Sequence, residues 1–374
     1  MKILLAGECY SENLGDGVIC RTVQHAIQDV LPEAEIVCLD LSGKTGYGPE
    51  PQQKNGCLYR ARRAVQETAI RLRNPLLYQV CQQDTDRHRR FCKQLDKCMK
   101  QRFDLVVFAG GALFMDYFAG VISLTVEAAA ERHIPVIFHA CGMGDCNAHS
   151  VALFSRSFRN PWVKSISLRD SYERFTRIFP GVAAEETYDT ALACSCCFAP
   201  SQSADARYGV GLISMARYEQ AQKNLLRSFL SAGVSWRAFT NGASYDQRFA
   251  EMLLRDVGIA PQEIALYLVP RTETPEQLVR TITSFSSIVS FRMHSQIVAA
   301  SYGIPSFGLV WDDKIREQYR KLGYAENCCL PEEWRIGYLE HLQRDPKEWR
   351  KKALQAGEAS IENLKQQLRK GGVL

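Results

Sequence analysis

The chain of 374 residues has no apolar run that approaches the roughly 20 residues needed to cross a bilayer as a helix. Its first residues, MKILLAGECYSENLGDG, contain one lysine and a short apolar run that stops at Gly7. This segment therefore predicts a first β-strand rather than a signal peptide. With 46% hydrophobic and 23% charged residues, the composition is typical of a soluble globular protein, which we expect to be cytoplasmic.

The 14 cysteines lack the spacing of a disulfide framework or of a metal site. The densest group is Cys194, Cys196 and Cys197, and neither a second close pair nor a nearby histidine accompanies it. We therefore expect reduced thiols and no bound metal. The sequence assigns no role to this group.

Positive charge is concentrated in one stretch. Residues 54–102 contain 13 Lys and Arg against four Asp and Glu, whereas the whole chain has a net charge of only +5. No aromatic platform or nucleic-acid-binding motif accompanies the charge, so nucleic acid is not an expected partner. The stretch predicts two helices broken at Asn74-Pro75, and it is interpreted either as a solvated helical face or as a surface for anionic lipid or a pyrophosphate-linked substrate.

Apolar runs such as FDLVVFAGG and IPVIFHACGMG alternate with helical segments along the rest of the chain. Uniformly apolar strands separated by helices predict parallel sheets that are covered on both faces. The main predicted helices are 17–31, 124–132, 219–232, 245–257, 274–285, 295–302 and 346–369, and IALYLVP (264–270) is predicted as a strand.

A polar segment, APSQSADAR (199–207), divides this pattern. We predict an α/β protein with two doubly wound, Rossmann-like domains that face a cleft, an architecture of the GT-B type. The predicted units are an N-terminal domain (1–199) with a basic insertion (54–102), a C-terminal domain (208–344) and a closing C-terminal helix (345–374). The first domain is expected on the acceptor side of the cleft and the second on the donor side.

Polar residues and glycines follow several strands of the first half, where a cleft would lie. Each has a structural alternative: Asp16 could cap a helix, the glycines could make tight turns, His139 could be a core histidine, and Arg169 and Asp170 could form a local pair. The candidates for ligand binding in this half are Asn13, Gly15, Asp16, Gly110, Gly111, His139, Gly142, Arg169 and Asp170.

The second half contributes Arg292 and His294, which we predict at the end of the strand SSIVSFRM, on one strand face. A buried, unpaired guanidinium is costly, so an anionic partner is expected for Arg292. Lys314, predicted at the end of the next strand, could join the same pocket. Arginines beside one histidine favour a site where a small, doubly anionic substrate undergoes proton transfer.

An ordered set of motifs spread over about 300 residues resembles the polysaccharide pyruvyl transferases. The motifs are NLGD (13–16), AGGALF (109–114), ACGMGD (140–145), LRD (168–170), YDTAL (188–192), FRMHSQIVAASYGIP (291–305) and Lys314. The sequence departs from the family pattern at Ala112, where a third glycine is usual, and around His139-Ala-Cys. These departures concern the sugar preference more than the reaction.

The resemblance implies a GT-B-like enzyme that transfers pyruvate from phosphoenolpyruvate onto two hydroxyls of one sugar as a cyclic ketal, without a cofactor. By motif, Arg292, His294 and Arg169 are the implied catalytic residues. His294 is expected to be the general acid, both arginines and Lys314 to hold the donor, and Asp16 or Asp170 to stabilise the developing oxocarbenium ion.

The implied acceptor is a lipid-linked or polymer-precursor saccharide of an exopolysaccharide, capsule or other envelope polymer. The basic stretch 54–102 would then contact a diphospholipid at the inner face of the membrane. Two alternatives stay open: a nucleotide-sugar-dependent glycosyltransferase of GT-B type, and a non-catalytic scaffold that kept the fold. The sequence does not reveal the sugar, its linkage, the ketal stereochemistry or the oligomeric state.

Overall fold

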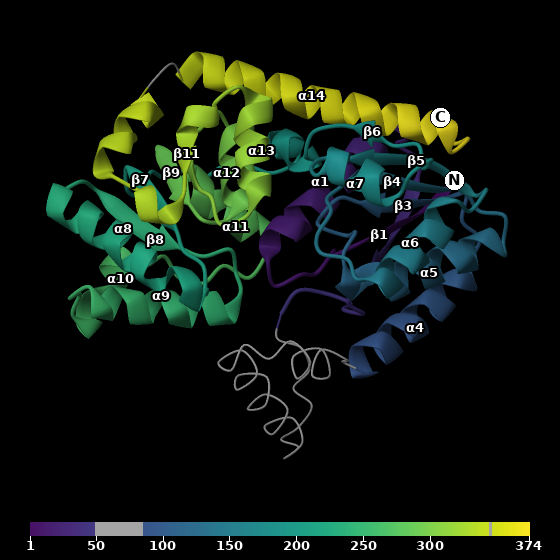
Figure 1. The fold of residues 1–374 in the computed structure, drawn as a ribbon, viewed down its shortest axis with the longest axis horizontal. Coiled ribbons are helices and arrows are strands. Elements are labelled where there is room, and N and C mark those ends of the chain that lie inside the picture. Colours follow the sequence, from purple (N-terminus) through teal and green to yellow (C-terminus); the bar gives the residue numbers. More distant parts are fainter. Residues whose placement is uncertain (49–84, 344–345) are drawn as a thin grey trace.

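A computed structural model describes residues 1–48, 85–343 and 346–374 (Figure 1). The break predicted at Asn74-Pro75 and most of the basic stretch lie outside the described residues. In the ranges that the structure describes, no helix combines the length and the apolar character needed to cross a bilayer.

The first half of the chain forms a parallel sheet of six strands in the order β2-β1-β3-β4-β5-β6. Its strands are β1 (Lys2–Gly7), β2 (Glu35–Asp40), β3 (Leu105–Ala109), β4 (Val136–Cys141), β5 (Val163–Leu168) and β6 (Glu185–Glu186). The helices of this half are α1 (Leu14–Val30), α4 (Thr85–Met99), α5 (Asp116–Ala130), α6 (Ala148–Phe158), α7 (Tyr172–Ile178) and the 3-10 helix η1 (Thr190–Cys196).

The central strands β1, β3 and β4 are buried on both faces, and their residues are almost all apolar. Along β1, Ile3 and Leu5 belong to the core that includes α1, whereas Leu4 and Ala6 belong to the core that includes α4 and α5. This alternation follows from the two-residue period of a strand.

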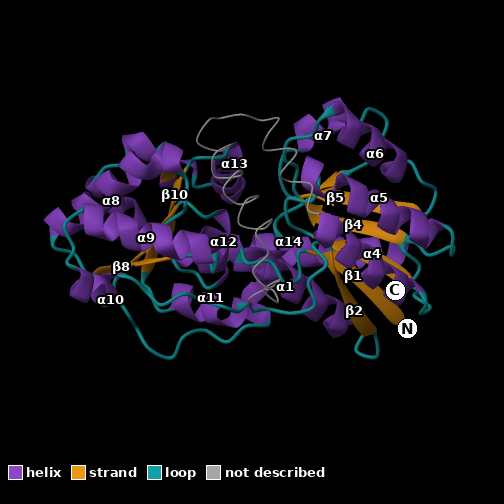
Figure 2. Cartoon of the chain, turned by 90° about the horizontal axis from the view of Figure 1, so that it is seen from below, coloured by secondary structure: helices purple, strands orange, loops and turns teal. Residues whose placement is uncertain are grey.

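The second half forms a parallel sheet of five strands in the order β11-β10-β9-β7-β8 (Figure 2). Its strands are β7 (Tyr208–Gly211), β8 (Trp236–Phe239), β9 (Ser287–Ser290), β10 (Ser306–Leu309) and β11 (Cys328–Cys329). Its helices are α8 (Glu219–Ala232), α9 (Ser244–Asp256), α10 (Ile264–Tyr267), α11 (Pro275–Thr283), α12 (Met293–Ser301) and α13 (Asp313–Leu322).

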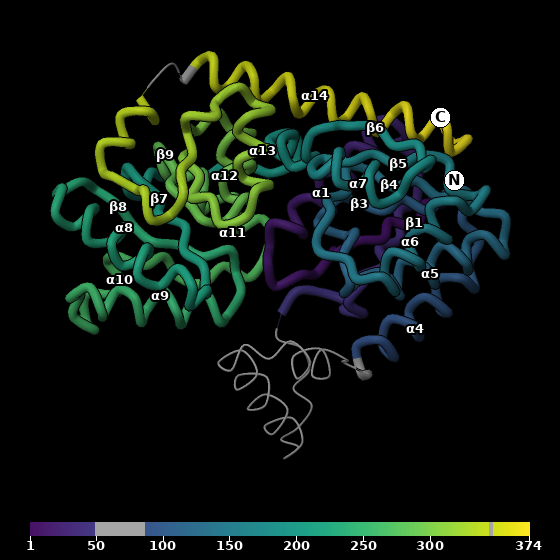
Figure 3. The backbone as a smooth tube through the Cα atoms, viewed as in Figure 1, coloured from purple at the N-terminus to yellow at the C-terminus, as the bar shows by residue number. Residues whose placement is uncertain are grey.

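The long helix α14 (Pro346–Lys370) runs from the second half back across the first (Figures 1 and 3). Near its end, the Gln367 amide donates to the Phe138 carbonyl at 2.9 Å, and the Ser360 hydroxyl donates to the Tyr188 carbonyl at 3.0 Å. These bonds attach the helix to β4 and to the segment before η1. The final helix therefore belongs to the packing of the first sheet although it follows the second in sequence.

Two parallel α/β sheets and a closing helix confirm the predicted fold class, whereas several elements differ from their predicted bounds. The strand predicted over 264–270 is wrong, because Ile264–Tyr267 form the short helix α10 and only Leu268 makes a bridge, to Ala238. Helix α5 begins at Asp116, eight residues before the predicted start at 124. Helices α6, α7 and α13 were not predicted.

Candidate functional site

Each sheet has one place where the order of the strands reverses, and parallel α/β sheets bind ligands at such switch points. In the first sheet β1 has β2 on one side and β3 on the other, and in the second sheet β7 lies between β8 and β9. Predicted site residues follow three of the strands at these switch points: β1 (Asn13, Gly15, Asp16), β3 (Gly110, Gly111) and β9 (Arg292, His294). Arg169 and Asp170 instead follow β5, farther along the first sheet.

The centre of the site is a contact between Arg169, which directly follows β5, and His294 on α12. Arg169 Nη1 lies 3.2 Å from His294 Nε2, and the two residues are 4% and 7% exposed. A guanidinium has no acceptor, so Nε2 must accept this hydrogen bond and the ring proton is assigned to Nδ1. The geometry therefore describes a neutral imidazole.

Two buried carboxylates orient Arg169. Its Nε donates to Asp170 Oδ2 at 3.2 Å, and its Nη1 donates to Asp189. The second oxygen of each carboxylate accepts a backbone N–H, Asp170 from Met143 at 3.0 Å and Asp189 from Ala191 at 2.8 Å. Arg169 is thus held in a fixed orientation by charged hydrogen bonds to Asp170 and Asp189.

Close backbone packing brings the two halves together at His294. A Cβ atom at Gly15, in the first turn of α1, would lie 2.4 Å from the His294 Cβ. Nearby, the Leu14 N–H donates to the Asn241 carbonyl at 2.9 Å. The absence of a side chain at Gly15 therefore lets the first helix approach the histidine of the other half.

Asp16 lies on the Nδ1 side of His294, with Oδ1 4.0 Å from Nδ1. Asn13 Nδ2 donates to the other carboxylate oxygen at 2.9 Å. A Cβ at Gly111, which has φ +78°, would lie 3.8 Å from Asp16 Oδ1. Asn13, Gly15, Asp16 and Gly111 are therefore gathered around His294.

The remaining glycines make room for their neighbours. A Cβ at Gly142 would lie 2.5 Å from Asp170 Oδ2 and 3.1 Å from Arg169 Nε, so this glycine lets the arginine pair approach the end of β4. A Cβ at Gly110 would collide with Ile19 of α1 at 2.4 Å, and the residue has φ +49°. Gly142 borders the site, whereas Gly110 serves the packing of α1.

Arg292 and His294 do not lie on one strand face, contrary to the prediction. Strand β9 ends at Ser290, whose hydroxyl accepts the Arg292 N–H at 2.9 Å, and α12 begins at Met293. Arg292 instead pairs with Asp246 of α9, which is the anionic partner that the sequence required. Its Nε is buried and has no hydrogen-bond partner among the described residues, so this donor is available to a ligand.

Lys314 also lies in a different element from the predicted one. It is in the first turn of α13 rather than at a strand end, and its Nζ is 3.5 Å from Asp312 Oδ2. It still acts on the site electrostatically. Burial lowers the pKa of His294 to about 4; Asp16 opposes this shift, and the positive charges of Arg169, Arg292 and Lys314 add to it.

Burial and neighbouring charges also compete in setting the pKa of Arg169, and here the charges have the larger effect. Burial lowers its pKa, but the neighbouring carboxylates Asp189, Asp170 and Asp16 outweigh burial and raise it above the ordinary value. The site therefore holds a charged arginine beside a neutral histidine at neutral pH.

His139 is not brought to this cluster. The residue is fully buried, with Nδ1 2.8 Å from Gln367 Oε1 and Nε2 2.8 Å from Thr190 Oγ1. Burial lowers its pKa to about 4. Both ring nitrogens thus have protein partners, and the histidine joins β4 to α14 and η1.

Three residues of the site were not among the residues predicted from the sequence. Asp189, which lies in the YDTAL motif (188–192), caps η1 and also binds Arg169. Asp246 had no recognisable signal in its helix. Lys321 on α13 donates to the Arg169 carbonyl at 2.7 Å and lies 2.7 Å from Glu186, so it connects the two halves beside the site.

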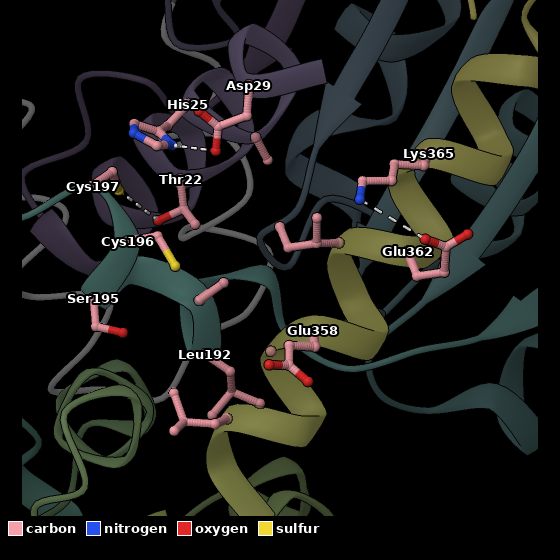
Figure 4. A pocket seen from close by; sticks show the side chains of 15 residues that line it. Thr22, His25, Asp29, Leu192, Ser195, Cys196, Cys197, Glu358, Glu362 and Lys365 are labelled. Atoms are coloured by element: carbon pink, nitrogen blue, oxygen red, sulfur yellow. Dashed lines mark hydrogen bonds and ion pairs between the residues drawn. The ribbon is translucent and has the colours of Figure 1, made fainter.

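A separate pocket of about 410 Å³ lies between α1, η1 and α14 (Figure 4). Cys196 and Cys197 line it together with the His25–Asp29 pair, in which Nδ1 and Oδ2 are 3.2 Å apart, and none of the predicted site residues does. The cysteines that the structure describes are free thiols. No group of three or more potential metal ligands occurs within the described ranges.

Chemically, the two halves bring together an oriented arginine, a neutral imidazole and a carboxylate. An arginine can bind a phosphate or carboxylate through two parallel hydrogen bonds, and a neutral imidazole can accept a proton. The arrangement suits an anionic ligand next to a proton-transfer step.

Comparisons with known proteins agree with this architecture. The chain resembles the UDP-GlcNAc 2-epimerase from Methanocaldococcus jannaschii, at 9% identity and a TM-score of 0.56 over 98% of this chain and 99% of the other. MnaA from S. aureus, in a structure with UDP, aligns at 10% identity and a TM-score of 0.55, over 100% and 97%. Sucrose-phosphate synthase from Thermosynechococcus elongatus aligns at 9% identity and a TM-score of 0.53, over 99% and 98%. At such identities the likeness establishes a GT-B-like fold alone.

A search of curated proteins found no match in sequence. The sequence profile described as "Polysaccharide pyruvyl transferase" matches residues 13–313, which include the Asn13–Asp16 turn, Arg169, His294 and most of both sheets. The chain therefore belongs to the polysaccharide pyruvyl transferase family.

Proposed function

We propose that the protein transfers pyruvate from phosphoenolpyruvate onto two hydroxyls of a saccharide and forms a cyclic ketal. The observation that carries this proposal is the contact across the two halves, in which Arg169 Nη1 lies 3.2 Å from His294 Nε2. A donor bound there would meet a fixed cation and a proton-transfer group at once. Membership of the family supports the same reaction.

The donor carries a phosphate and a carboxylate, so it needs more than one cation. Arg169 is oriented by Asp170 and Asp189, and Arg292 has a buried Nε available for a ligand. We assign these two residues, with Lys314 nearby, to the donor. Since Arg169 and His294 are almost fully buried, the two halves must separate to admit it.

His294 is assigned to proton transfer. Because its ring starts neutral, its first act is to accept a proton from the attacking sugar hydroxyl. The sequence led us to expect His294 as the acid that protonates the methylene carbon of the donor; in this scheme its acid step is instead the protonation of the departing phosphate by the imidazolium. Asp16 stabilises that imidazolium, as its carboxylate faces Nδ1 at 4.0 Å.

For the acceptor we propose a saccharide carried on a diphospholipid, as in the synthesis of an envelope polymer. The support is the basic composition of residues 54–102, most of which lie outside the described residues. A variant with Arg62, Arg63, Arg71 and Arg73 changed to Glu should lose activity on a lipid-linked acceptor and keep it on a soluble sugar. Equal loss on both acceptors would contradict the lipid contact.

The proposed reaction is tested by phosphate release from phosphoenolpyruvate with a panel of galactosides, glucosides and mannosides, free and diphospholipid-linked, with mass spectrometry of each acceptor. We expect an acid-labile pyruvyl adduct on one acceptor, together with stoichiometric phosphate. No adduct on any acceptor would refute the proposal. Turnover of a nucleotide sugar without any response to phosphoenolpyruvate would establish the glycosyltransferase alternative instead.

A further inference from the structure

Glu8 carries a partly buried carboxyl at the switch point of the first sheet. The reaction proposed above assigns no role to this residue. It directly follows Gly7, the last residue of β1, and β1 lies between β2 and β3. The loop that it begins leads to Asn13 and Asp16. A carboxyl at this place is on the edge of the sheet where the ligand is expected.

The alternation of β1 shows which way Glu8 is directed. A Cβ at Gly7 would meet Cys20 of α1 at 2.9 Å, and Cys9 belongs to the same core as α1. Glu8, between them, is therefore directed to the opposite face, where α4 and α5 lie.

The carboxyl of Glu8 has no hydrogen bond or ion pair within the ranges that the structure describes, although charged groups surround it. These groups are Asp16 on α1, Asp40 at the end of β2, Lys44 in the following loop and Arg87 on α4. Burial, Asp16 and Asp40 raise the pKa of Glu8 well above its ordinary value, and they outweigh Arg87 and Lys44. This setting therefore favours the protonated carboxyl.

Asp16 links Glu8 to His294. Its carboxylate lies 4.0 Å from His294 Nδ1, and it is the nearby charge with the largest effect on both groups. A carboxyl with a raised pKa and an imidazole with a lowered pKa thus both interact with one carboxylate. Pairs of titratable groups held in opposite protonation states are the pattern of an acid and a base in one reaction.

We propose that Glu8 is the general acid that protonates the methylene carbon of phosphoenolpyruvate, while His294 is the base for the first sugar hydroxyl. This inference rests on the proposed function. The raised pKa of Glu8 favours a proton donor and the lowered pKa of His294 favours a proton acceptor, so one histidine is not required to act at both the methylene carbon and the sugar hydroxyl.

Protons are conserved over the steps of this reaction. In the first step the Glu8 O–H bond breaks and a C–H bond forms at the methylene carbon; the first hydroxyl bonds to the central carbon and gives its proton to His294. In the second step the carbon–phosphate oxygen bond breaks, and His294 returns its proton to the leaving phosphate. The second hydroxyl then closes the ketal and gives its proton to Glu8. Both groups end as they began.

The test compares Glu8→Gln and Glu8→Asp with Glu12→Gln, a matched control on the exposed part of the same loop. Glu8→Gln keeps the size of the side chain but cannot give up a proton, so kcat should fall by roughly 10²- to 10⁴-fold. Binding of phosphoenolpyruvate, measured by calorimetry, should be unchanged. In Glu8→Asp the alkaline limb of the pH–kcat profile should move to lower pH, which a merely structural role would not cause.

A measurement without substrate separates this inference from the proposed function. The infrared spectrum of the wild-type protein at pH 7, minus that of Glu8→Gln, should contain the band of a protonated carboxyl. Absence of the band, or a Glu8→Gln variant as active as Glu12→Gln, would overturn the role of Glu8 alone. If the wild-type protein forms no pyruvyl adduct, the proposed function fails and the assigned step fails with it, whatever the spectrum shows.

Discussion

At the scale of single residues, the cations of the site are held in fixed positions by carboxylates. Arg169 binds Asp170 and Asp189, Arg292 binds Asp246, and Lys314 faces Asp312. With so much negative charge nearby, net charge alone would not attract an anionic donor. Recognition must therefore depend on directed N–H groups, and this makes the planar fork of an arginine hard to replace.

This argument predicts that Arg169→Lys is not a conservative change. Lysine keeps the charge but cannot reach both carboxylates and the donor, so kcat/KM for phosphoenolpyruvate should fall about 100-fold or more, as when a preorganised donor is lost from an active site. Arg174→Lys is the matched control, because this exposed arginine pairs with Asp145 on the surface. Equal activity of both variants would remove Arg169 from the donor site.

At the scale of elements, two helical glycines differ in the free space around the position of an added Cβ atom. Gly120 in α5 has no atom within 4 Å of an added Cβ, whereas a Cβ at Gly357 in α14 would lie 2.9 Å from the Leu192 carbonyl oxygen. Alanine favours a helix over glycine by about 0.5–1 kcal/mol, but a collision with backbone cannot be relieved by a rotamer change.

Gly120→Ala should therefore raise the free energy of unfolding by about 0.5–1 kcal/mol, while Gly357→Ala should lower it by about 1–3 kcal/mol. Urea denaturation of the two variants beside the wild type measures both values. A stabilising Gly357→Ala would mean that α14 can shift away from η1 without cost.

The elements also show what the sequence could predict. Helix α8 matches its predicted bounds of 219–232, because its apolar positions recur with helical spacing and Gly233 ends it in a left-handed conformation. The error over 264–270 has a physical reason: a short apolar run has no distinctive period, and Leu266 is in fact 68% exposed.

Motif positions predicted that Asp16, Arg169 and His294 follow strands, and the structure brings these three side chains together. The geometry of their surroundings was not predictable. The turn after β9 depends on the Ser290 side chain, and the pairing of Arg292 with Asp246 depends on tertiary packing. Neither feature leaves a local pattern in the sequence, and the same holds for His139, whose partner Gln367 is 228 residues away.

At the scale of the whole molecule, two buried neutral histidines couple stability to pH. The pKa values of His139 and His294 are lowered to about 4 by burial, compared with an ordinary value near 6.5. Because the unfolded chain binds these protons first, their contribution to stability is complete above about pH 6.5 and is lost as the pH falls towards 4.

We therefore expect the free energy of unfolding to fall by about 2 kcal/mol per histidine between pH 7 and pH 5. His139→Gln should remove about 2 kcal/mol of this fall, while the exposed His149→Gln should leave it unchanged. Chemical denaturation at several pH values measures the slope. An unchanged slope in His139→Gln would show that folding does not lower the pKa of His139.

The path of α14 has a consequence for how the protein is made. Gln367 satisfies the Phe138 carbonyl and the Ser165 hydroxyl inside the first sheet, yet it leaves the ribosome after the whole second sheet. The first half therefore remains incomplete during most of translation, with one face of its sheet short of a helix. Partly folded chains that expose apolar surface tend to associate, and a fragment ending before α14 would expose the same face of the sheet.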